Sequence, residues 1–501
     1  MTQAPLEHIV IVGGGSAGWM TAAGLGRFMR ASPTRVTVIE SDDIGIIGVG
    51  EASLPLLTIF NQLIGLNERD FVTKTQGTFK LGIEFVDWRR KDHRYFHPFS
   101  AYGQNFDACD FHHHWLMAKA GGEGGELDDY NVNSLLARQN RFGVHDRNQA
   151  SPMATAAHAF HFDASLYARH LRGHAEAHGV NRIEGRIVSV QQDSETGHVT
   201  GVTLASGQTV EGDFFVDCSG FRALLIEGAL KTGYVDWTSL LPCDRAVAVP
   251  CERASPLTPY TRSTARDSGW QWRIPLQHRT GNGYVYSSNF ISDDEAAETL
   301  LANLDGKPLA DPRVVPFRTG RRARAWNKNV VAIGLSAGFL EPLESTSIHL
   351  IQKGVQKLIK SLPNRDFSPH LRDEFNRQTA YDYDDVRDFL VLHYKQTERE
   401  DTPFWAYNKH NTISDSLQAR MDLFTDTGRI FINEHELFKL TSWLAVMYGQ
   451  GLRPRSYDPM ADTLPFDKVV KNLSLMRGLI ADAVAQQPMH ADFIARHCLA
   501  A

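Results

Sequence analysis

Cysteine is scarce in this chain of 501 residues. Five are present, an odd number, and they are scattered along the whole sequence. A small disulfide-rich protein carries more cysteines at closer spacing, so we expect reduced thiols that behave as buried small hydrophobes, and a cytoplasmic location. The five are Cys109, Cys218, Cys243, Cys251 and Cys498.

The chain also lacks an excess of positive charge. It has 52 basic and 58 acidic residues, so no broad positive field favours nucleic acid or an anionic membrane. Residues 9–26 carry no charge, but six glycines within them argue against a membrane span. No Lys or Arg precedes Arg27, so a secretory signal would lack its positive start. These absences favour an enzyme acting on small molecules; a homodimer is left open.

A glycine-rich turn near the start of the chain has the order of a dinucleotide-binding unit. A continuous apolar run ends on the first glycine of a GxGxxG pattern, an Ala/Gly-rich helical stretch follows, and the next strand ends on an acid. The glycines permit a tight turn, backbone approach to a pyrophosphate and close packing of helix on strand; the acid can accept hydrogen bonds from a ribose. The predicted contacts are Gly13, Gly15, Ser16, Ala17, Gly18 and Glu40.

The remaining pattern predicts an α/β protein in two parts. Residues 185–210 alternate with Gly, Ser and Asp turns, which is typical of a β-meander. From about residue 365 onward, aromatic and charged positions alternate in a way that indicates mostly helices. We predict a discontinuous, Rossmann-like box domain formed by residues 1–95 and 155–360, and a helical substrate-binding cap formed by residues 96–154 and 361–501.

Seven segments of the sequence resemble segments of the tryptophan halogenase family, in the same order and over nearly the whole chain. Each segment alone is moderate support, whereas their joint occurrence by chance is negligible. The segments are GGGSAGWMTAA, GVGEASLP, FKLGIEF, VDCSGFRALLI, GWQWRIP, EPLESTSIHLI and DTPFWAYNKH.

The resemblance implies a FAD-binding box joined to a helical pyramid, and a flavin-dependent halogenation. In that family reduced FAD reacts with O2 to give a C4a-hydroperoxide, and chloride or bromide attacks it to release hypohalous acid. The acid then reaches the lysine that matches Lys80, which passes the halogen to an electron-rich aromatic ring. An amine can carry an electrophilic halogen, and burial lowers the pKa of a lysine so that its neutral form becomes available.

The same matching assigns roles around the EPLESTSIHLI segment. Glu344 matches a carboxylate that stabilises the cationic ring intermediate and takes its proton. Ser345 matches the residue that links the flavin and substrate sites. The backbone amides of Thr346 and Ser347 match the halide site, at a helix start suited to an anion. The family commonly has glycine at the position of Ser347, so the preferred halide is left open.

Further residues are assigned by resemblance to the flavin and to the channel between the two sites. Trp270 and Trp272 alternate on a strand and so share a face, where the family uses this pair to separate the organic substrate from the flavin. The residues expected to contact FAD, mainly through their backbone, are Ala52, Val188, Leu335 and Ile348.

The segment at residues 431–443 departs from the family members that act on tryptophan. It is shorter and lacks the tyrosine pair and the asparagines that hold the free amino acid. We therefore expect an indole or a larger aromatic metabolite as the substrate, with the natural substrate and the halogenated ring position left open. No second glycine fingerprint for a nicotinamide is present, so a separate flavin reductase is expected to supply FADH2.

Two other functions remain open at this point. An FAD-dependent aromatic hydroxylase shares the fold, although Lys80 and the GWQWRIP segment favour halogenation. A flavin-binding protein without turnover is the second alternative, although Glu344 and Lys80 are both retained. Histidines at 112–114 and at 170, 174 and 178 invite a metal site, but no cysteine or carboxylate pattern completes a usual one, so no metal is expected.

Overall fold

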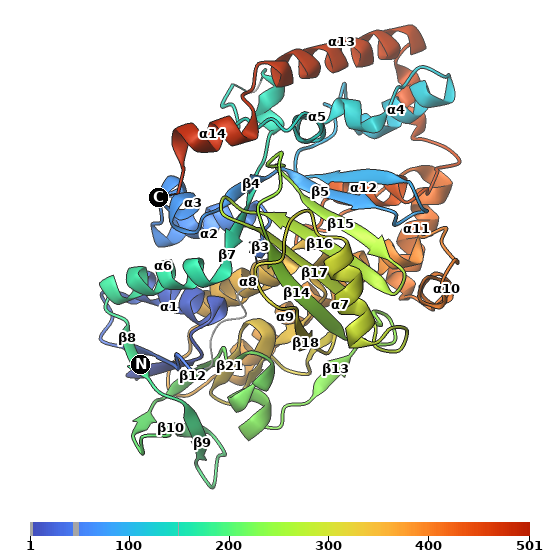
Figure 1. Ribbon diagram of the computed structural model, residues 1–501. Helices are drawn as coiled ribbons and strands as arrows, with labels where there is room; N and C mark the ends of the chain where they lie inside the picture. The colour runs from blue at the N-terminus through green and yellow to red at the C-terminus, as the bar shows by residue number, and fades with distance from the viewer. Residues whose placement is uncertain (1–3, 44–49, 149, 501) are drawn as a thin grey trace.

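A computed structural model describes residues 4–43, 50–148 and 150–500 of the chain. Gly48 and Val49, which open the GVGEASLP segment, lie outside the described residues. Figure 1 shows a lower part built on a mostly parallel sheet, a central layer of antiparallel strands and an upper region of helices. The described chain thus has the α/β class that the sequence predicts, with helices gathered towards its C-terminal part.

The glycine-rich turn belongs to a six-stranded sheet, in which β1 (His8–Val12) is central and pairs in parallel with β12 and β2. All five residues of β1 are buried, which is why its sequence is a continuous apolar run. Helices α1 (Ser16–Met29), α6 (Ala164–Ala177) and α8 (Thr346–Lys360) pack together beside this sheet. In order the strands are β20 (Trp326–Asn327), β21 (Val330–Ala332), β12 (Phe214–Asp217), β1, β2 (Arg35–Glu40) and β8 (Asn181–Glu184).

The predicted β-meander is confirmed as an antiparallel three-stranded sheet. It extends away from the parallel sheet at the bottom of Figure 1, where β9 and β10 are labelled. Its strands are β9 (Ile187–Gln192), β10 (Val199–Leu204) and β11 (Thr209–Glu211).

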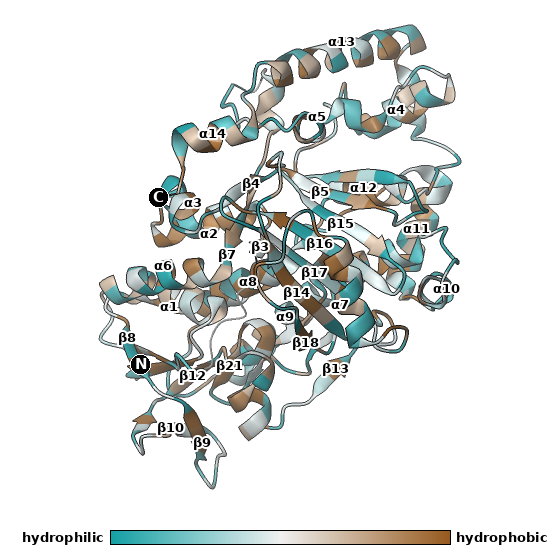
Figure 2. Ribbon diagram, in the orientation of Figure 1, coloured by the Kyte–Doolittle hydropathy of each residue, from teal (hydrophilic) through white to brown (hydrophobic). Residues whose placement is uncertain are grey.

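A seven-stranded sheet forms the central layer, and all of its neighbouring strands are antiparallel except β15 and β5. Figure 2 shows hydrophobic colour on its inner strands, such as β14. In order they are β18 (Arg313–Pro316), β14 (Arg245–Cys251), β17 (Thr280–Tyr286), β16 (Gly269–Pro275), β15 (Thr261–Arg266), β5 (Gly82–Val86) and β6 (Arg94–Pro98).

Two further small sheets each contain three strands. The first, which packs through β3 on the central layer, contains β3 (Gly50–Ala52), β7 (Ala159–Asp163) and β4 (Thr78–Lys80). The second contains β13 (Tyr234–Asp236), β19 (Gly320–Arg322) and β22 (Gly338–Phe339). Helix α2 (Leu56–Ile64) contacts α8 and α3 (Glu68–Lys74), whereas α7 (Asp293–Ala302) packs on β17 and β14 of the central layer.

The C-terminal part is mainly helical, as the sequence predicts, and α13 packs against α4 and α5 from the middle of the chain. The predicted division into box and cap stays a prediction, and β6 runs across its boundary at residue 95. None of the described helices has the length and apolar character needed to cross a bilayer. The helices are α4 (Phe111–Ala120), α5 (Val132–Arg138), α9 (Pro369–Lys395), α10 (Pro403–His410), α11 (Asp415–Thr427), α12 (Leu440–Gly449), α13 (Phe466–Ala485) and α14 (His490–His497).

Candidate active site

Lys80 lies at the end of β4 with its side chain fully buried. Its ammonium nitrogen Nζ donates hydrogen bonds to the hydroxyl of Ser345 at 2.8 Å and to the carbonyl of Ser53 at 3.2 Å. The same nitrogen lies 5.1 Å from the centre of the Phe99 ring. Burial lowers the pKa of Lys80 to about 7, although the nearby Glu344 carboxylate acts in the opposite direction. A neutral amine is therefore accessible near neutral pH.

Ser345 joins this lysine to the start of α8. Its backbone is left-handed, with φ 58° and ψ 34°, a conformation that costs a residue with a Cβ on the order of 1 kcal/mol. A serine at this N-cap position commonly caps the helix with its side chain, but here the hydroxyl makes no such bond and accepts from Lys80 instead. The strained turn thus directs the hydroxyl towards the amine.

Glu344 precedes this turn in a short helix over Pro342–Glu344 and is completely buried. His97 Nδ1 lies 3.0 and 2.9 Å from its two oxygens, and His393 Nε2 lies 2.8 Å from one of them. Burial alone would raise the pKa of this carboxyl group, but the charges and hydrogen bonds of the two histidines outweigh it and lower the pKa to about 2. Glu344 is therefore an anion at neutral pH.

His97 and His393 are not predicted by any pattern in the sequence. His97 comes from β6, and His393 comes from the C-terminal end of α9, so each lies far from Glu344 along the chain. His393 Nδ1 also lies 2.8 Å from the carbonyl of Phe389, which only accepts hydrogen bonds. Its other nitrogen lies beside the Glu344 carboxylate, so both ring nitrogens face hydrogen-bond acceptors. Two signals were available in the sequence. One histidine precedes a Pro-Phe pair, and the other follows the apolar run at residues 389–392.

The two tryptophans of the GWQWRIP segment lie on β16 and pack against each other, with ring centres 6.2 Å apart. Trp270 Nε1 donates to Glu341 Oε2 at 2.9 Å, and the Tyr394 hydroxyl donates to the same oxygen. Trp272 Nε1 is buried without a hydrogen-bond partner among the described residues. The shared face predicted from the sequence is confirmed, and Trp270 is fixed by Glu341.

The predicted phosphate turn has the shape that the glycine spacing requires. A Cβ added to Gly13 would lie 2.3 Å from the carbonyl oxygen of Cys218, and one added to Gly18 would lie 1.8 Å from that of Gly13. A Cβ on Gly15 would meet nothing within 4 Å. The turn is therefore closely packed on its inner side and open at Gly15, where α1 begins with unpaired backbone amides. This cradle fits the pyrophosphate of FAD.

Glu40 lies at the end of β2, beside the same turn. Its carboxylate accepts hydrogen bonds from Trp19 Nε1 at 3.1 Å and from Arg182 Nε. The acid predicted to bind a ribose thus lies where expected, with its side chain already bonded to neighbours. Its contact with a ribose stays a prediction.

The other residues predicted to contact FAD are spread over four elements. Gly334 packs closely against Ala17, because a Cβ there would lie 2.7 Å from the Ala17 side chain. Leu335 follows Gly334 and therefore lies beside the glycine-rich turn. Ala52 ends β3, Ile348 lies in the first turn of α8, and Val188 lies on β9 with its side chain 56% exposed.

The predicted halide residues begin α8. Thr346 is buried, and its hydroxyl has no hydrogen-bond partner among the described residues. By their position in the first turn, the amides of Thr346 and Ser347 have no acceptor within the helix. They thus form a donor pair one residue beyond Ser345, which is consistent with an anion between the flavin cradle and Lys80.

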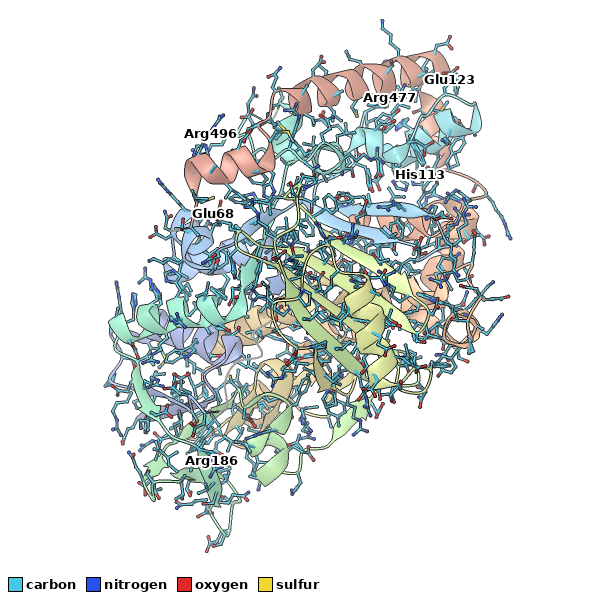
Figure 3. All side chains as sticks on the ribbon, in the orientation of Figure 1. Glu68, His113, Glu123, Arg186, Arg477 and Arg496 are labelled. Atoms are coloured by element: carbon cyan, nitrogen blue, oxygen red, sulfur yellow. The ribbon has the colours of Figure 1, made fainter. Side chains whose placement is uncertain are left out.

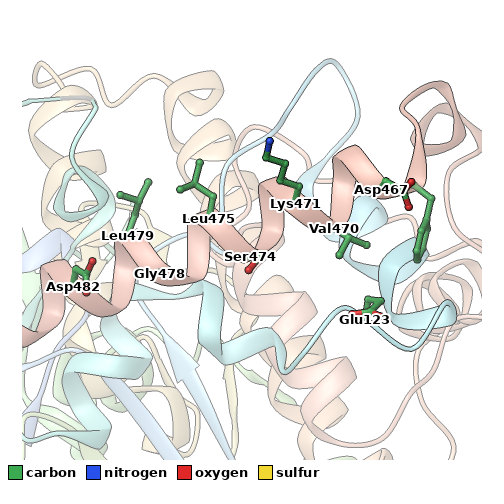
Figure 4. A pocket seen from close by; sticks show the side chains of 10 residues that line it. Glu123, Asp467, Val470, Lys471, Ser474, Leu475, Gly478, Leu479 and Asp482 are labelled. Atoms are coloured by element: carbon green, nitrogen blue, oxygen red, sulfur yellow. The ribbon is translucent and has the colours of Figure 1, made fainter.

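A large surface groove does not belong to this cluster. It has a volume of about 710 Å³ and runs along the outer side of α13, where Figure 4 shows Lys471, Leu475, Leu479 and Asp482 on the helix. None of the residues around Lys80 or Glu344 lines it. This groove is therefore separate from the buried cluster around Lys80 and Glu344.

A dinucleotide cradle joined by one helix start to a buried amine and a buried carboxylate defines a class of enzyme, the flavin-dependent halogenases. The family model described as tryptophan halogenase matches residues 8–466. The chain is thus a member of the tryptophan halogenase family. Enzymes of this family use FADH2, O2 and a halide.

Individual relatives agree with this assignment. The flavin-dependent halogenase Xcc4156 from Xanthomonas campestris is 44% identical, with a TM-score of 0.96 and 99% of each chain covered. BrvH, a flavin-dependent halogenase from Brevundimonas sp. BAL3, is 46% identical, with a TM-score of 0.94, covering 98% of this chain and 99% of that one. The tryptophan 6-halogenase SttH of Streptomyces toxytricini is 35% identical, over 92% of this chain and 93% of its own.

Proposed function

We propose that this enzyme halogenates an electron-rich aromatic ring, such as an indole, and that Lys80 delivers the halogen. The observation that carries the proposal is the hydrogen bond from the buried Lys80 amine to Ser345, the residue that follows the buried Glu344 carboxylate. Amine and carboxylate are thus held on two sides of one turn, at the start of the helix that also abuts the flavin cradle.

FAD fits the cradle at Gly15, with Ser16, Ala17 and Leu335 beside it. When bound in its reduced form it would supply the two electrons with which O2 converts a halide and a proton into hypohalous acid and water. We infer that a separate flavin reductase provides this FADH2, because the sequence has one dinucleotide fingerprint. Thr346 and Ser347 would hold the halide through their amides.

The lysine step follows from the state of its amine. Neutral Lys80 attacks the halogen of hypohalous acid, forming an N–X bond and releasing water once the amine proton joins the departing hydroxide. The aromatic ring then takes the halogen from nitrogen, and the amine recovers its proton. Ser345 orients the amine throughout, and the packing around Lys80 excludes bulk water.

Glu344 acts on the aromatic ring of the substrate. Attack on the halogen leaves a positively charged ring, which an adjacent carboxylate stabilises before accepting the proton from the substituted carbon. His97 and His393 keep Glu344 ionised for this purpose and fix its orientation. Both histidines are therefore positioning residues.

Trp270 and Trp272 lie where they would separate the flavin site from the site of the aromatic substrate. Their packed rings form a bulky barrier, and the hydrogen bond to Glu341 fixes Trp270. The Trp272 N–H without a protein partner is a donor suited to a small polar molecule such as hypohalous acid. Such a wall would let the acid pass and would keep the organic substrate from the flavin. A hydroxylase has no need for this separation or for the buried amine.

Replacing Gly15 with valine is expected to lower FAD affinity by about a hundredfold or more, because the new side chain occupies the open side of the turn. The variant should fold, since a Cβ at Gly15 meets no atom of the described residues within 4 Å. Flavin fluorescence titration measures the affinity, and thermal unfolding checks the fold. Gly13→Val is the contrasting variant, because its Cβ strikes backbone and should destabilise the protein itself. Unchanged FAD affinity in Gly15→Val would place the cofactor elsewhere.

The substrate proposal concerns the segment between α11 and α12. Phe431 at its start is 68% exposed, whereas Phe438 near its end stacks on Phe389 with ring centres 3.7 Å apart. Trp443 packs edge-on against the same ring at 4.9 Å. This aromatic group lies beside His97 and suits a flat ring near Glu344. The segment has no tyrosine to hold the amine or carboxylate of free tryptophan, and the side-chain amide of its one asparagine, Asn433, donates to Glu436 at 2.7 Å.

Indole is therefore expected to be halogenated with a kcat/KM at least about tenfold above that of free tryptophan. The segment lacks the paired polar side chains that would bind the amine and carboxylate of the amino acid. The assay contains the enzyme, FAD, a flavin reductase, NADH and either chloride or bromide, with products measured by mass spectrometry. The halogen isotope pattern ranks the two halides in the same experiment. Efficient turnover of tryptophan at a single ring position would refute this substrate class while leaving the lysine mechanism intact.

A further inference from the structure

A second group of reactive side chains lies outside the active site, in the loop before α4. Asp107, Cys109 and His114 each present one ligand atom, and these three atoms lie within 4.8 Å of one another. Figure 3 labels the neighbouring His113 on α4, in the helical region above the central sheet. No metal is expected at this histidine run from the sequence, because no cysteine or carboxylate pattern completes a usual site. The loop nevertheless brings Asp107 and Cys109 close to His114.

His114 gives an independent sign of a missing partner. The residue has no exposed surface, and neither of its ring nitrogens has a hydrogen-bond partner among the described residues. Leaving a buried polar group unpaired costs on the order of 1 kcal/mol or more. Its Nε2 points towards Asp107 Oδ2 at 3.6 Å, which is too long for a hydrogen bond. Two nitrogen or oxygen ligands of one tetrahedral zinc ion are separated by about 3.4 Å, close to this spacing.

The other two side chains are arranged to share the same ion. Asp107 Oδ1 accepts the backbone N–H of Cys109 at 2.7 Å, which leaves Oδ2 free on the side of His114. Cys109 is only 4% exposed, and its sulfur makes a single weak contact, 3.8 Å from the carbonyl of Asp110. Asp107 is exposed at the rim, so an ion could enter past it and keep a water molecule as a fourth ligand.

The charge around the group also favours a cation. Asp107, Asp110 and Asp458 all act on Cys109 with negative charge, and the opposing cation Arg429 is itself paired with Asp458 at 3.0 Å. Such an excess of carboxylates is unfavourable around a thiolate until a positive ion joins them.

We propose that Asp107, Cys109 and His114 bind a zinc ion that fastens the loop before α4 to the first turns of that helix. A set of one oxygen, one sulfur and one imidazole nitrogen suits Zn²⁺, whereas Mg²⁺ and Ca²⁺ prefer oxygen ligands throughout. The ion would supply the missing partner of His114 and stabilise this part of the cap. The proposal is independent of the halogenation chemistry, because none of the three residues touches the Lys80 cluster.

Cobalt substitution tests the site in the full-length, tag-free protein. The metal-free enzyme is titrated with Co²⁺, and we expect one equivalent to produce a thiolate-to-cobalt absorption band that Zn²⁺ then abolishes. Cys109→Ser should lose this band, and His114→Gln should weaken cobalt affinity by about tenfold or more. Cys498→Ser is the matched control, because it removes another buried thiol and should leave the band unchanged.

Three results would overturn the proposal. The wild-type protein shows no sulfur-to-cobalt band, Cys109→Ser keeps it, or Cys498→Ser loses it. If Cys109→Ser fails to fold, as judged by circular dichroism, His114→Gln and the wild-type titration decide. A thermal shift adds a separate readout, because an ion that binds only the folded state raises the melting temperature of the wild type by an amount that grows with the logarithm of the ion concentration, and this rise should vanish in the ligand variants.

Discussion

Lys80→Ala is expected to reduce the halogenation rate by about a thousandfold or more, the scale of losing a covalent or general-acid–base group. The amine is fully buried, and it is the side chain that the Ser345 hydroxyl faces. Without it, hypohalous acid has no nitrogen to which the halogen can be transferred near the ring. Haloindole formation, measured by mass spectrometry, should fall to background, while FAD affinity and NADH-driven O2 consumption persist.

Two further variants separate loss of the amine from loss of packing. Lys80→Met keeps most of the side-chain volume and should be as inactive as Lys80→Ala. Lys357→Met removes another buried lysine, one that pairs with Asp382 at 2.7 Å between α8 and α9, and it should retain halogenation. Product formation at the wild-type rate in either Lys80 variant would show that the amine does not carry the halogen.

The glycine-rich turn and the tryptophan strand were accessible from the sequence because their signals are local, whereas Lys80 was assigned through the resemblance of FKLGIEF to the family. The run before Gly13, the glycine spacing and the alternation of Trp270 with Trp272 each reflect a short segment whose neighbours along the chain are also its neighbours in space. The turn at Ser345 could be located as well, since EPLEST ends just where α8 begins. For such segments the residue pattern alone is enough to predict the local structure.

The residues that surround the Glu344 carboxylate could not be predicted from local patterns. His97 belongs to β6, and His393 lies at the far end of a 27-residue helix, and only the packing of α9 against the central layer brings both to Glu344. The group at Asp107, Cys109 and His114 was missed for a related reason. Its residues are close in sequence, but their spacing matches no common zinc motif, and the loop geometry that turns them together has no distinct composition.

Glu344→Gln is expected to lower the halogenation rate by about a hundredfold to a thousandfold, because an amide neither stabilises a cationic ring as a charge does nor accepts its proton. The substitution keeps the size of the side chain, so FAD binding and O2 consumption should remain. It also leaves His97 and His393 without the anion that they flank. Haloindole formation again provides the measurement, and a rate within a factor of two of the wild type would exclude Glu344 from the chemistry.

The pH dependence of the residual rate gives a sharper test, because Glu344 acts on Lys80 as well as on the ring. Lys80 has a pKa of about 7 and attacks the halogen only when neutral, so the wild-type rate should rise as the pH increases through about 7. The negative charge of Glu344 raises this pKa, and removing that charge should move the rise to lower pH in Glu344→Gln.

Burial also raises the pKa of Glu341 to about 7, despite its hydrogen bonds with Tyr394 and Trp270. The rise should therefore persist in Glu341→Gln if it belongs to Lys80, whereas its disappearance there would assign it to Glu341.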